Sequence, residues 1–101
     1  MISDIKRDGN YLQILDVNGK KIAEKSESSA GYLVGFNSNY VICRLSNYFV
    51  VYDFNFRKIC EKSESSTGEF VNTVGDTMNF RKDSYIVTYD VNFKKISERH
   101  A

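Results

Sequence analysis

The chain has 101 residues, enough for one domain with a hydrophobic core, and its 42% apolar and 14% aromatic residues exclude a disordered, charge-dominated chain. Fourteen basic and thirteen acidic side chains leave a net charge of +1, which argues against nucleic-acid binding, because nucleic-acid-binding surfaces are usually basic. No apolar run is long enough to span a membrane, and no apolar leader segment follows Met1, so we expect a soluble, cytoplasmic protein without a membrane partner.

One sequence unit occurs three times along the chain. The strings that begin at Tyr11, Tyr48 and Tyr85 start 37 residues apart and align without gaps. Residues 11–37 match residues 48–74 at 13 of 27 positions, and residues 48–64 match residues 85–101 at 9 of 17. Such a period is typical of symmetric arrays in which one unit cannot bury its own apolar face. We expect a single repeat domain over 1–101, with a partial unit at about 1–30 and further units at about 31–67 and 68–101.

Each unit is predicted to form four short antiparallel strands, so the fold class is all-β. In the second unit they are expected at about 31–37, 40–45, 48–54 and 57–62. The third strand is apolar at nearly every position, as in a strand between two packed layers. The fourth strand carries charge at most positions, which suits an exposed edge.

Turn residues separate these strands. Hairpin chemistry occurs between the second and third strands, at Asp8-Gly9-Asn10, Ser46-Asn47 and Asp83-Ser84. An Asp-x-Asn triplet then predicts a second turn, in which the Asp side chain accepts nearby backbone N–H groups. Two runs of sequence Ser-Glu-Ser-Ser, which begin at Ser26 and Ser63, are expected to be polar connectors between units.

The order of strands within a unit resembles a β-propeller blade read from the axis to the rim. The segment from Thr77 to Arg99, in which Tyr89-Asp90 closes the third strand, is similar to the generic blade pattern. This resemblance covers the whole chain and rests on spacing and polarity. It implies tandem four-stranded antiparallel units of 37 residues that build a propeller-like ring.

A second resemblance is to the bulb-type mannose-binding lectins. It rests on Arg7-Asp8-Gly9-Asn10 followed by Leu15-Asp16, and these lectins also place three repeats in about this length. Their sugar motif is Q-x-D-x-N-x-V-x-Y, and the third unit reads Arg81-x-Asp83-x-Tyr85-x-Val87-x-Tyr89, with the Gln and Asn replaced. The alternative is therefore a three-fold β-prism monomer that acts as a lectin-like carbohydrate-binding module.

The number of units bears on assembly. Met1 aligns with Ser38, so the first strand of the first unit is missing, and about three blades cannot close a propeller, which needs at least about four. We expect a homodimer, or a higher homo-oligomer, that completes a ring with identical seams between blades.

No residue constellation specifies a reaction, so we expect no catalytic residues, no metal, no cofactor and no enzyme activity. His100 is the only histidine, and it lies beside the last residue of the chain. Asp16, Asn18 and Glu27 match three positions of a calcium loop, but lysines stand where an oxygen ligand and a glycine are required. Cys43 and Cys60 lack metal-ligand spacing and are expected to be buried thiols rather than a disulfide.

The candidate ligand-binding residues form one repeated pair, an Arg followed four residues later by a Tyr. If a three-residue turn separates them, the two side chains face each other across a hairpin. They then form either a structural cross-strand pair or a ring of pockets for a small anionic or planar ligand. We expect a non-enzymatic binding or assembly protein with a ligand or protein surface at its turns. The residues are Arg7, Tyr11, Arg44, Tyr48, Arg81 and Tyr85.

Overall fold

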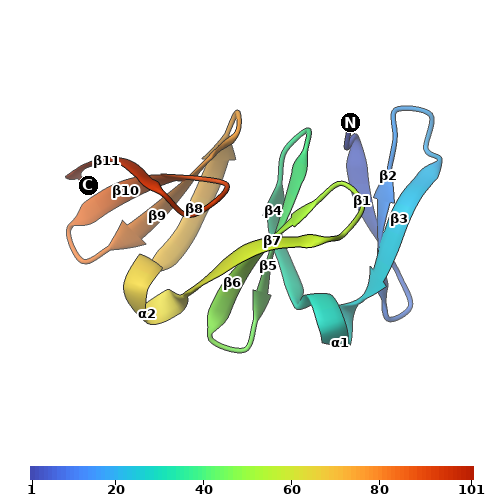
Figure 1. Cartoon of the computed structure of the whole chain (residues 1–101), viewed down its shortest axis with the longest axis horizontal. Coiled ribbons are helices and arrows are strands. Elements are labelled where there is room, and N and C mark those ends of the chain that lie inside the picture. Colours follow the sequence, from blue (N-terminus) through green and yellow to red (C-terminus); the bar gives the residue numbers. More distant parts are fainter.

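The computed structural model describes residues 1–101 as three antiparallel sheets joined by two one-turn helices, α1 (Glu27–Ala30) and α2 (Glu64–Thr67) (Figure 1). In every sheet, strands that follow one another in the chain are neighbours. The first sheet contains β1 (Asp4–Asp8), β2 (Tyr11–Leu15) and β3 (Lys21–Ser26). The second sheet contains β4 (Tyr32–Phe36), β5 (Tyr40–Leu45), β6 (Tyr48–Asp53) and β7 (Lys58–Ser63). The third sheet contains β8 (Glu69–Val74), β9 (Thr77–Lys82), β10 (Tyr85–Asp90) and β11 (Lys95–His100).

The all-β class and the four strands of the second unit are confirmed. The Ser-Glu-Ser-Ser runs connect successive sheets, as expected, and each leads into a helix of one turn. Ser26 and Ser63 are extended, and the chain then turns until Gly31 or Gly68 ends the helix with a positive φ of 95° or 79°. Serine and glutamate tolerate the first turn of a helix, and glycine readily adopts the conformation that ends it.

The three sheets lie side by side along the 40 Å axis of the molecule, with the second sheet between the other two (Figure 1). We call the contact of the first and second sheets the first seam, and that of the second and third sheets the second seam. Val50 and Tyr52 of β6 are buried in the first seam, whereas Phe49 and Val51 are buried in the second. The prediction that this strand is apolar on both faces is confirmed, because it separates two cores.

The last strand of each sheet is charged, as predicted. One lysine and one glutamate three residues apart form an ion pair on each of these strands. The pairs are Lys21–Glu24, Lys58–Glu61 and Lys95–Glu98. Charged side chains on an edge strand hinder pairing with another chain.

The Asp-x-Asn triplets form the predicted turns. The side chain of Asp53 accepts the backbone N–H of Asn55 at 2.8 Å and that of Arg57 at 2.9 Å. Burial raises the pKa of Asp53, but these two N–H groups and the Arg57 guanidinium together outweigh it and hold the pKa below its usual range. A carboxylate whose pKa is lowered on folding stabilises the protein above its unfolded-state pKa, and this contribution disappears as the pH falls through the folded-state pKa.

Replacing Asp53 by asparagine should therefore lower the midpoint of thermal unfolding at neutral pH. The difference from the wild type should shrink as the solution is acidified below the folded-state pKa of Asp53. Melting curves followed by circular dichroism across this pH range test the expectation. Asp76→Asn is the control, because Asp76 lies in an exposed turn. A deficit of the Asp53 variant that stays constant with pH would contradict the role of the charge.

The outward face of the first sheet is more polar than the inward faces of the other two. At five columns, the second and third units bury an apolar or aromatic residue against the preceding sheet. The first unit instead has smaller or polar residues at those columns. The first-unit residues, each followed by its counterparts in the second and third units, are Asp4 (Val41, Met78), Lys6 (Cys43, Phe80), Gln13 (Val50, Val87), Leu15 (Tyr52, Tyr89) and Gly19 (Phe56, Phe93).

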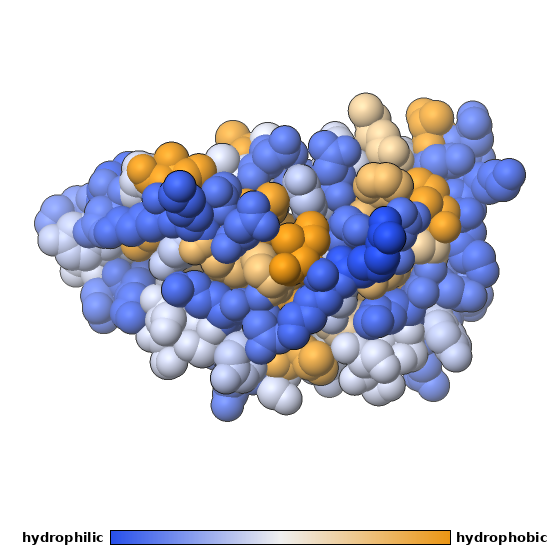
Figure 2. Space-filling view, in the orientation of Figure 1, coloured by the Kyte–Doolittle hydropathy of each residue, from blue (hydrophilic) through white to orange (hydrophobic).

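The outward face of the third sheet shows the same change. Asn79 stands where Ile5 and Ile42 occur, Thr88 where Ile14 and Val51 occur, and Ser97 where Ala23 and Cys60 occur. The surface over this sheet is mostly hydrophilic with one apolar patch, and further apolar atoms are exposed near the middle of the molecule and toward its other end (Figure 2). A second copy stacked on either end would meet these polar residues. The residues on the two outward faces therefore differ from those buried in the two seams within the chain.

Candidate binding site

The predicted contact between Arg and Tyr across the hairpin is wrong. The turns contain two residues rather than three, and their first residue has a positive φ: 61° at Gly9, 55° at Ser46 and 54° at Asp83. Each arginine consequently pairs with the residue after the tyrosine: Arg7 with Leu12, Arg44 with Phe49 and Arg81 with Ile86. Because neighbouring residues of a strand point to opposite faces, Arg and Tyr lie on opposite sides of the sheet.

Two of the three arginines are paired with glutamate. Arg7 contacts Glu27 at 3.0 Å, and Arg44 contacts Glu64 at 2.7 Å, so each bonds the connector that follows its own sheet. Ala101 occupies the equivalent position after the third sheet. Its backbone N–H donates to the Ser84 carbonyl, just as the N–H groups of Glu27 and Glu64 donate to the carbonyls of the corresponding turns. Arg81 has no carboxylate within ion-pair distance in the structure. Sequence reasoning missed the Arg–Glu pairs, although their constant separation of 20 residues in two units was visible.

Two grooves along the rim that carries α1 and α2 are related by the repeat. Groove 1 has a volume of about 410 Å³ and groove 2 about 400 Å³. Every residue that lines groove 2 is 37 positions after a residue that lines groove 1. Groove 1 is lined by Asn10, Glu27, Ser28, Gly31, Tyr32, Arg44, Leu45 and Ser46, and groove 2 by Ser65, Gly68, Glu69, Arg81, Lys82 and Asp83.

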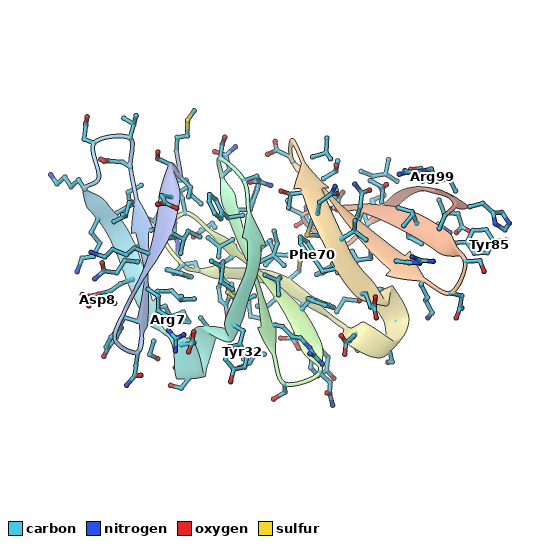
Figure 3. The ribbon with its side chains drawn as sticks, turned by 180° about the vertical axis from the view of Figure 1, so that it is seen from behind. Arg7, Asp8, Tyr32, Phe70, Tyr85 and Arg99 are labelled. Carbon is cyan, nitrogen blue, oxygen red and sulfur yellow. The ribbon has the colours of Figure 1, made fainter.

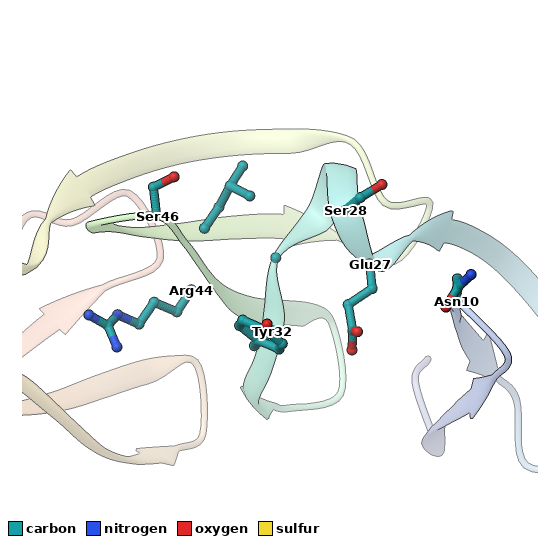
Figure 4. A pocket seen from close by; sticks show the side chains of 8 residues that line it. Asn10, Glu27, Ser28, Tyr32, Arg44 and Ser46 are labelled. Carbon is teal, nitrogen blue, oxygen red and sulfur yellow. The ribbon is translucent and has the colours of Figure 1, made fainter.

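Groove 1 combines one aromatic ring with several polar groups. Tyr32 is 70% exposed at the start of β4, and Glu27 and Asn10 lie on one side of its ring while Arg44 lies on the other (Figure 4). The Arg44 guanidinium is already neutralised by Glu64, so this groove offers amide and hydroxyl groups rather than a free positive charge. Such a mixture suits a polar ligand with one flat apolar face.

Groove 2 has a different chemistry on the same backbone. Glu69, Lys82 and Asp83 replace Tyr32, Leu45 and Ser46. The Lys82 ammonium donates to the carbonyls of Ser65 and Ser66 at 2.8 and 3.2 Å, which holds the connector against the hairpin. The repeat therefore conserves the position and the approximate size of the groove, while the lining residues change its chemistry.

Of the six predicted site residues, only Arg44 and Arg81 line a groove. Arg7 lines neither groove. The rings of Tyr11, Tyr48 and Tyr85 are 50%, 44% and 39% exposed outside both grooves. Tyr85 lies beside His100, with ring centroids 4.5 Å apart, at the end of the molecule opposite Arg7 (Figure 3). The structure therefore does not place the six residues in a set of equivalent pockets.

The buried ionisable groups are structural. Burial raises the pKa of Cys43 to about 12, and raises the pKa of Tyr52 to about 12. The Tyr52 hydroxyl donates to the Ala30 carbonyl at 3.0 Å, across the first seam. Burial also raises the pKa of Cys60 to about 11, and its thiol donates to the Val91 carbonyl across the second seam. Both cysteines are free, and they face opposite seams.

Because a thiolate rather than a thiol attacks disulfides, both thiols should react slowly with Ellman's reagent in mildly alkaline buffer. Addition of guanidinium chloride should release two equivalents of thiol promptly. A rapid native reaction of Cys43 would contradict its burial, and fewer than two thiols after denaturation would indicate a disulfide.

No group of three or more His, Cys, Asp or Glu side chains is placed to hold a metal ion. None of the helices has the length and apolar character needed to cross a lipid bilayer. The fold and the grooves define an all-β protein of three packed antiparallel sheets whose 37-residue sequence unit repeats along the chain. Searches with family models, curated proteins and solved structures find no match to this chain.

Proposed function

We propose that this chain is a non-enzymatic binding protein with a propeller-like arrangement of sheets, which presents ligand sites at the turns along one rim. The observation that carries the proposal is the pair of grooves related by the repeat. A groove that recurs 37 residues later, with the same backbone and different side chains, is a scaffold on which binding specificity varies. Surface loops held by a rigid framework commonly carry such sites.

The packing of the sheets supports the propeller-like part of the proposal. Consecutive four-stranded antiparallel sheets pack face to face, and their first strands, β4 and β8, adjoin. Phe70 of β8 lies against Gly35 of β4, where a Cβ would approach the ring to 2.9 Å, and the Thr73 hydroxyl donates to the Phe36 carbonyl at 3.3 Å. The outward faces differ in composition from the two seams, so the proposal concerns the single chain.

A carbohydrate-binding role is the second candidate, and the chemistry of groove 1 favours it. A saccharide presents an apolar ring face and many hydroxyl groups. Tyr32 offers a ring for stacking, and Asn10, Ser28 and Ser46 offer hydrogen-bonding groups around it. This candidate uses groove 1 rather than the lectin motif, whose Gln and Asn are replaced.

The proposal is tested by titrating the ¹⁵N-labelled protein with two sets of probes, the methyl glycosides of mannose, galactose and glucose, and short uncharged peptides. We expect one set to shift the backbone amides of groove 1 in two-dimensional NMR spectra at millimolar concentration. Tyr32→Ala should remove these shifts, whereas Tyr48→Ala should keep them, because Tyr48 is exposed outside the grooves. Shifts from the glycosides alone favour the carbohydrate role. If neither set shifts the amides of either groove, the proposal fails.

A further inference from the structure

The outward face of the third sheet carries two arginines without a carboxylate partner. Arg81 of β9 and Arg99 of β11 both pair in register with Ile86 of β10, so the three side chains form one row on one face. Neither guanidinium has an acidic partner within ion-pair distance, whereas Arg7 and Arg44 each contact a glutamate. Arg99 lies at the outer end of this sheet (Figure 3).

The repeat shows what the same row contacts in the other two sheets. There the arginine holds a glutamate carboxylate at 3.0 or 2.7 Å, and the row lies against the following sheet. The Lys25 ammonium, which occupies the Arg99 column, lies 5.8 Å from the centre of the Tyr52 ring of that following sheet. The row in the third sheet therefore has positive side chains at the same two positions. It lacks both the glutamate that pairs with the arginine and the aromatic ring beside the second cation.

Apolar side chains accompany the two arginines. Ile86 is half-buried, and Ile96 is 55% exposed, although its counterparts Ile22 and Ile59 pack against the cores of the two seams. Asn72, Asn79 and Thr88 form the next row, where Asn79 donates to Asn72 at 2.8 Å and Thr88 donates to Asn79 at 2.6 Å. These polar groups bond one another, so they lower the cost of covering the face with a partner.

We propose that the outward face of the third sheet is a docking surface for an acidic segment of a partner protein, with carboxylates on Arg81 and Arg99 and an apolar or aromatic side chain on Ile86 and Ile96. Charge complementarity selects this occupant. Glu69 pairs in register with Arg81 and is the only acidic residue of this row. With Arg81 and Arg99 in the same row, the net charge of the row is positive. Arginine is favoured at interfaces because its planar guanidinium binds carboxylates through two hydrogen bonds. A second copy fits less well, because the outward face of the first sheet presents Lys6 and Lys21 beside Asp4 and Glu24.

The test uses two synthetic peptides in which glutamate or lysine alternates with phenylalanine. We expect the glutamate peptide to shift the amides of Ile86, Thr88, Ser97 and Arg99, with an affinity that falls when salt is added. Arg81→Gln and Arg99→Gln should each weaken binding at least about tenfold, as expected for loss of a charge-assisted contact. Arg57→Gln is the matched control, because Arg57 is exposed and pairs with Asp53 on another sheet.

Equal binding of the lysine peptide, or an equal loss in Arg57→Gln, would overturn the proposal. So would shifts confined to the amides of groove 2, such as Ser65 and Gly68, because Arg81 also lines that groove. Sedimentation supplies a further check: a dimer of the free protein that Arg99→Gln dissociates would identify a second copy as the occupant and overturn the acidic partner. This proposal does not depend on ligand binding at the grooves, since Arg99 lies outside both.

Discussion

Replacing Gly68 by alanine is expected to lower the free energy of unfolding by about 3 kcal/mol or more. Gly68 follows α2 with a φ of 79° and a ψ of −155°, a conformation that is nearly exclusive to glycine. A Cβ there would lie 2.1 Å from the carbonyl oxygen of Arg81, which belongs to the backbone of β9 and cannot move without disturbing the ladder. Urea denaturation followed by circular dichroism measures the effect.

Two companion variants separate the clash from the backbone conformation. Gly31→Ala should behave like Gly68→Ala, because a Cβ at Gly31 would lie 2.5 Å from the Arg44 carbonyl oxygen. Gly75→Ala should cost only about 1–2 kcal/mol, since Gly75 also has a positive φ but no atom lies within 4 Å of its Cβ position. Equal losses at Gly68 and Gly75 would show that the connector does not press against the neighbouring hairpin.

Phe80→Ala is expected to destabilise the protein by about 3–5 kcal/mol. Phe80 is fully buried at the centre of the second seam. Its ring contacts four others, with centroid distances of 5.0 Å to Phe49, 5.4 Å to Phe70, 5.7 Å to Tyr89 and 5.8 Å to Phe93. Truncation removes buried apolar surface and leaves a cavity among side chains that belong to two sheets.

The control for this variant is Phe54→Ala, which removes the same side chain from a site that is 41% exposed. It should cost under about 1 kcal/mol, as is usual for surface substitutions. Both values come from chemical denaturation under the same conditions. A loss at Phe80 as small as that at Phe54 would show that the second and third sheets do not share a core.

Much of the fold follows from local sequence. The continuous apolar run Phe49-Val50-Val51-Tyr52 predicts a strand between two layers, because apolar residues at successive positions cover both faces of a strand. The charged fourth strands and the Asp-x-Asn turns also follow from local chemistry, and the structure confirms both.

The arrangement of the site could not be predicted in the same way, because it depends on turn length and on contacts between sheets. With a turn of three residues, Arg44 would pair with Tyr48. The observed turn has two residues, so Arg44 pairs with Phe49 instead. That choice depends on the positive φ of Ser46, which serine adopts less readily than glycine or asparagine. The grooves combine residues of successive sheets, such as Asn10 and Tyr32, and no spacing in the sequence shows that these are neighbours.

The composition of the two outward faces could not be predicted from the repeat alone either. The repeat is visible in the sequence as identity at columns such as Arg, Tyr and Asp, whereas the polar end faces are visible only when the columns are assigned to faces. In the sequence, Asn79 and Thr88 are two of many positions at which the units differ. Only the strand register shows that both lie on the outward face of the third sheet. The same assignment identifies Lys6 and Gln13 as outward-facing residues of the first sheet.

Sedimentation equilibrium at micromolar concentration shows whether one chain, with its three packed sheets, is the binding unit. We expect a single species with the 11.6 kDa mass of one chain. We also expect this mass to be unchanged in Phe54→Ala and Tyr48→Ala, whose side chains are exposed outside the seams. A mass twice that of the chain would show that the outward faces join two copies, and that a dimer rather than one chain is the binding unit.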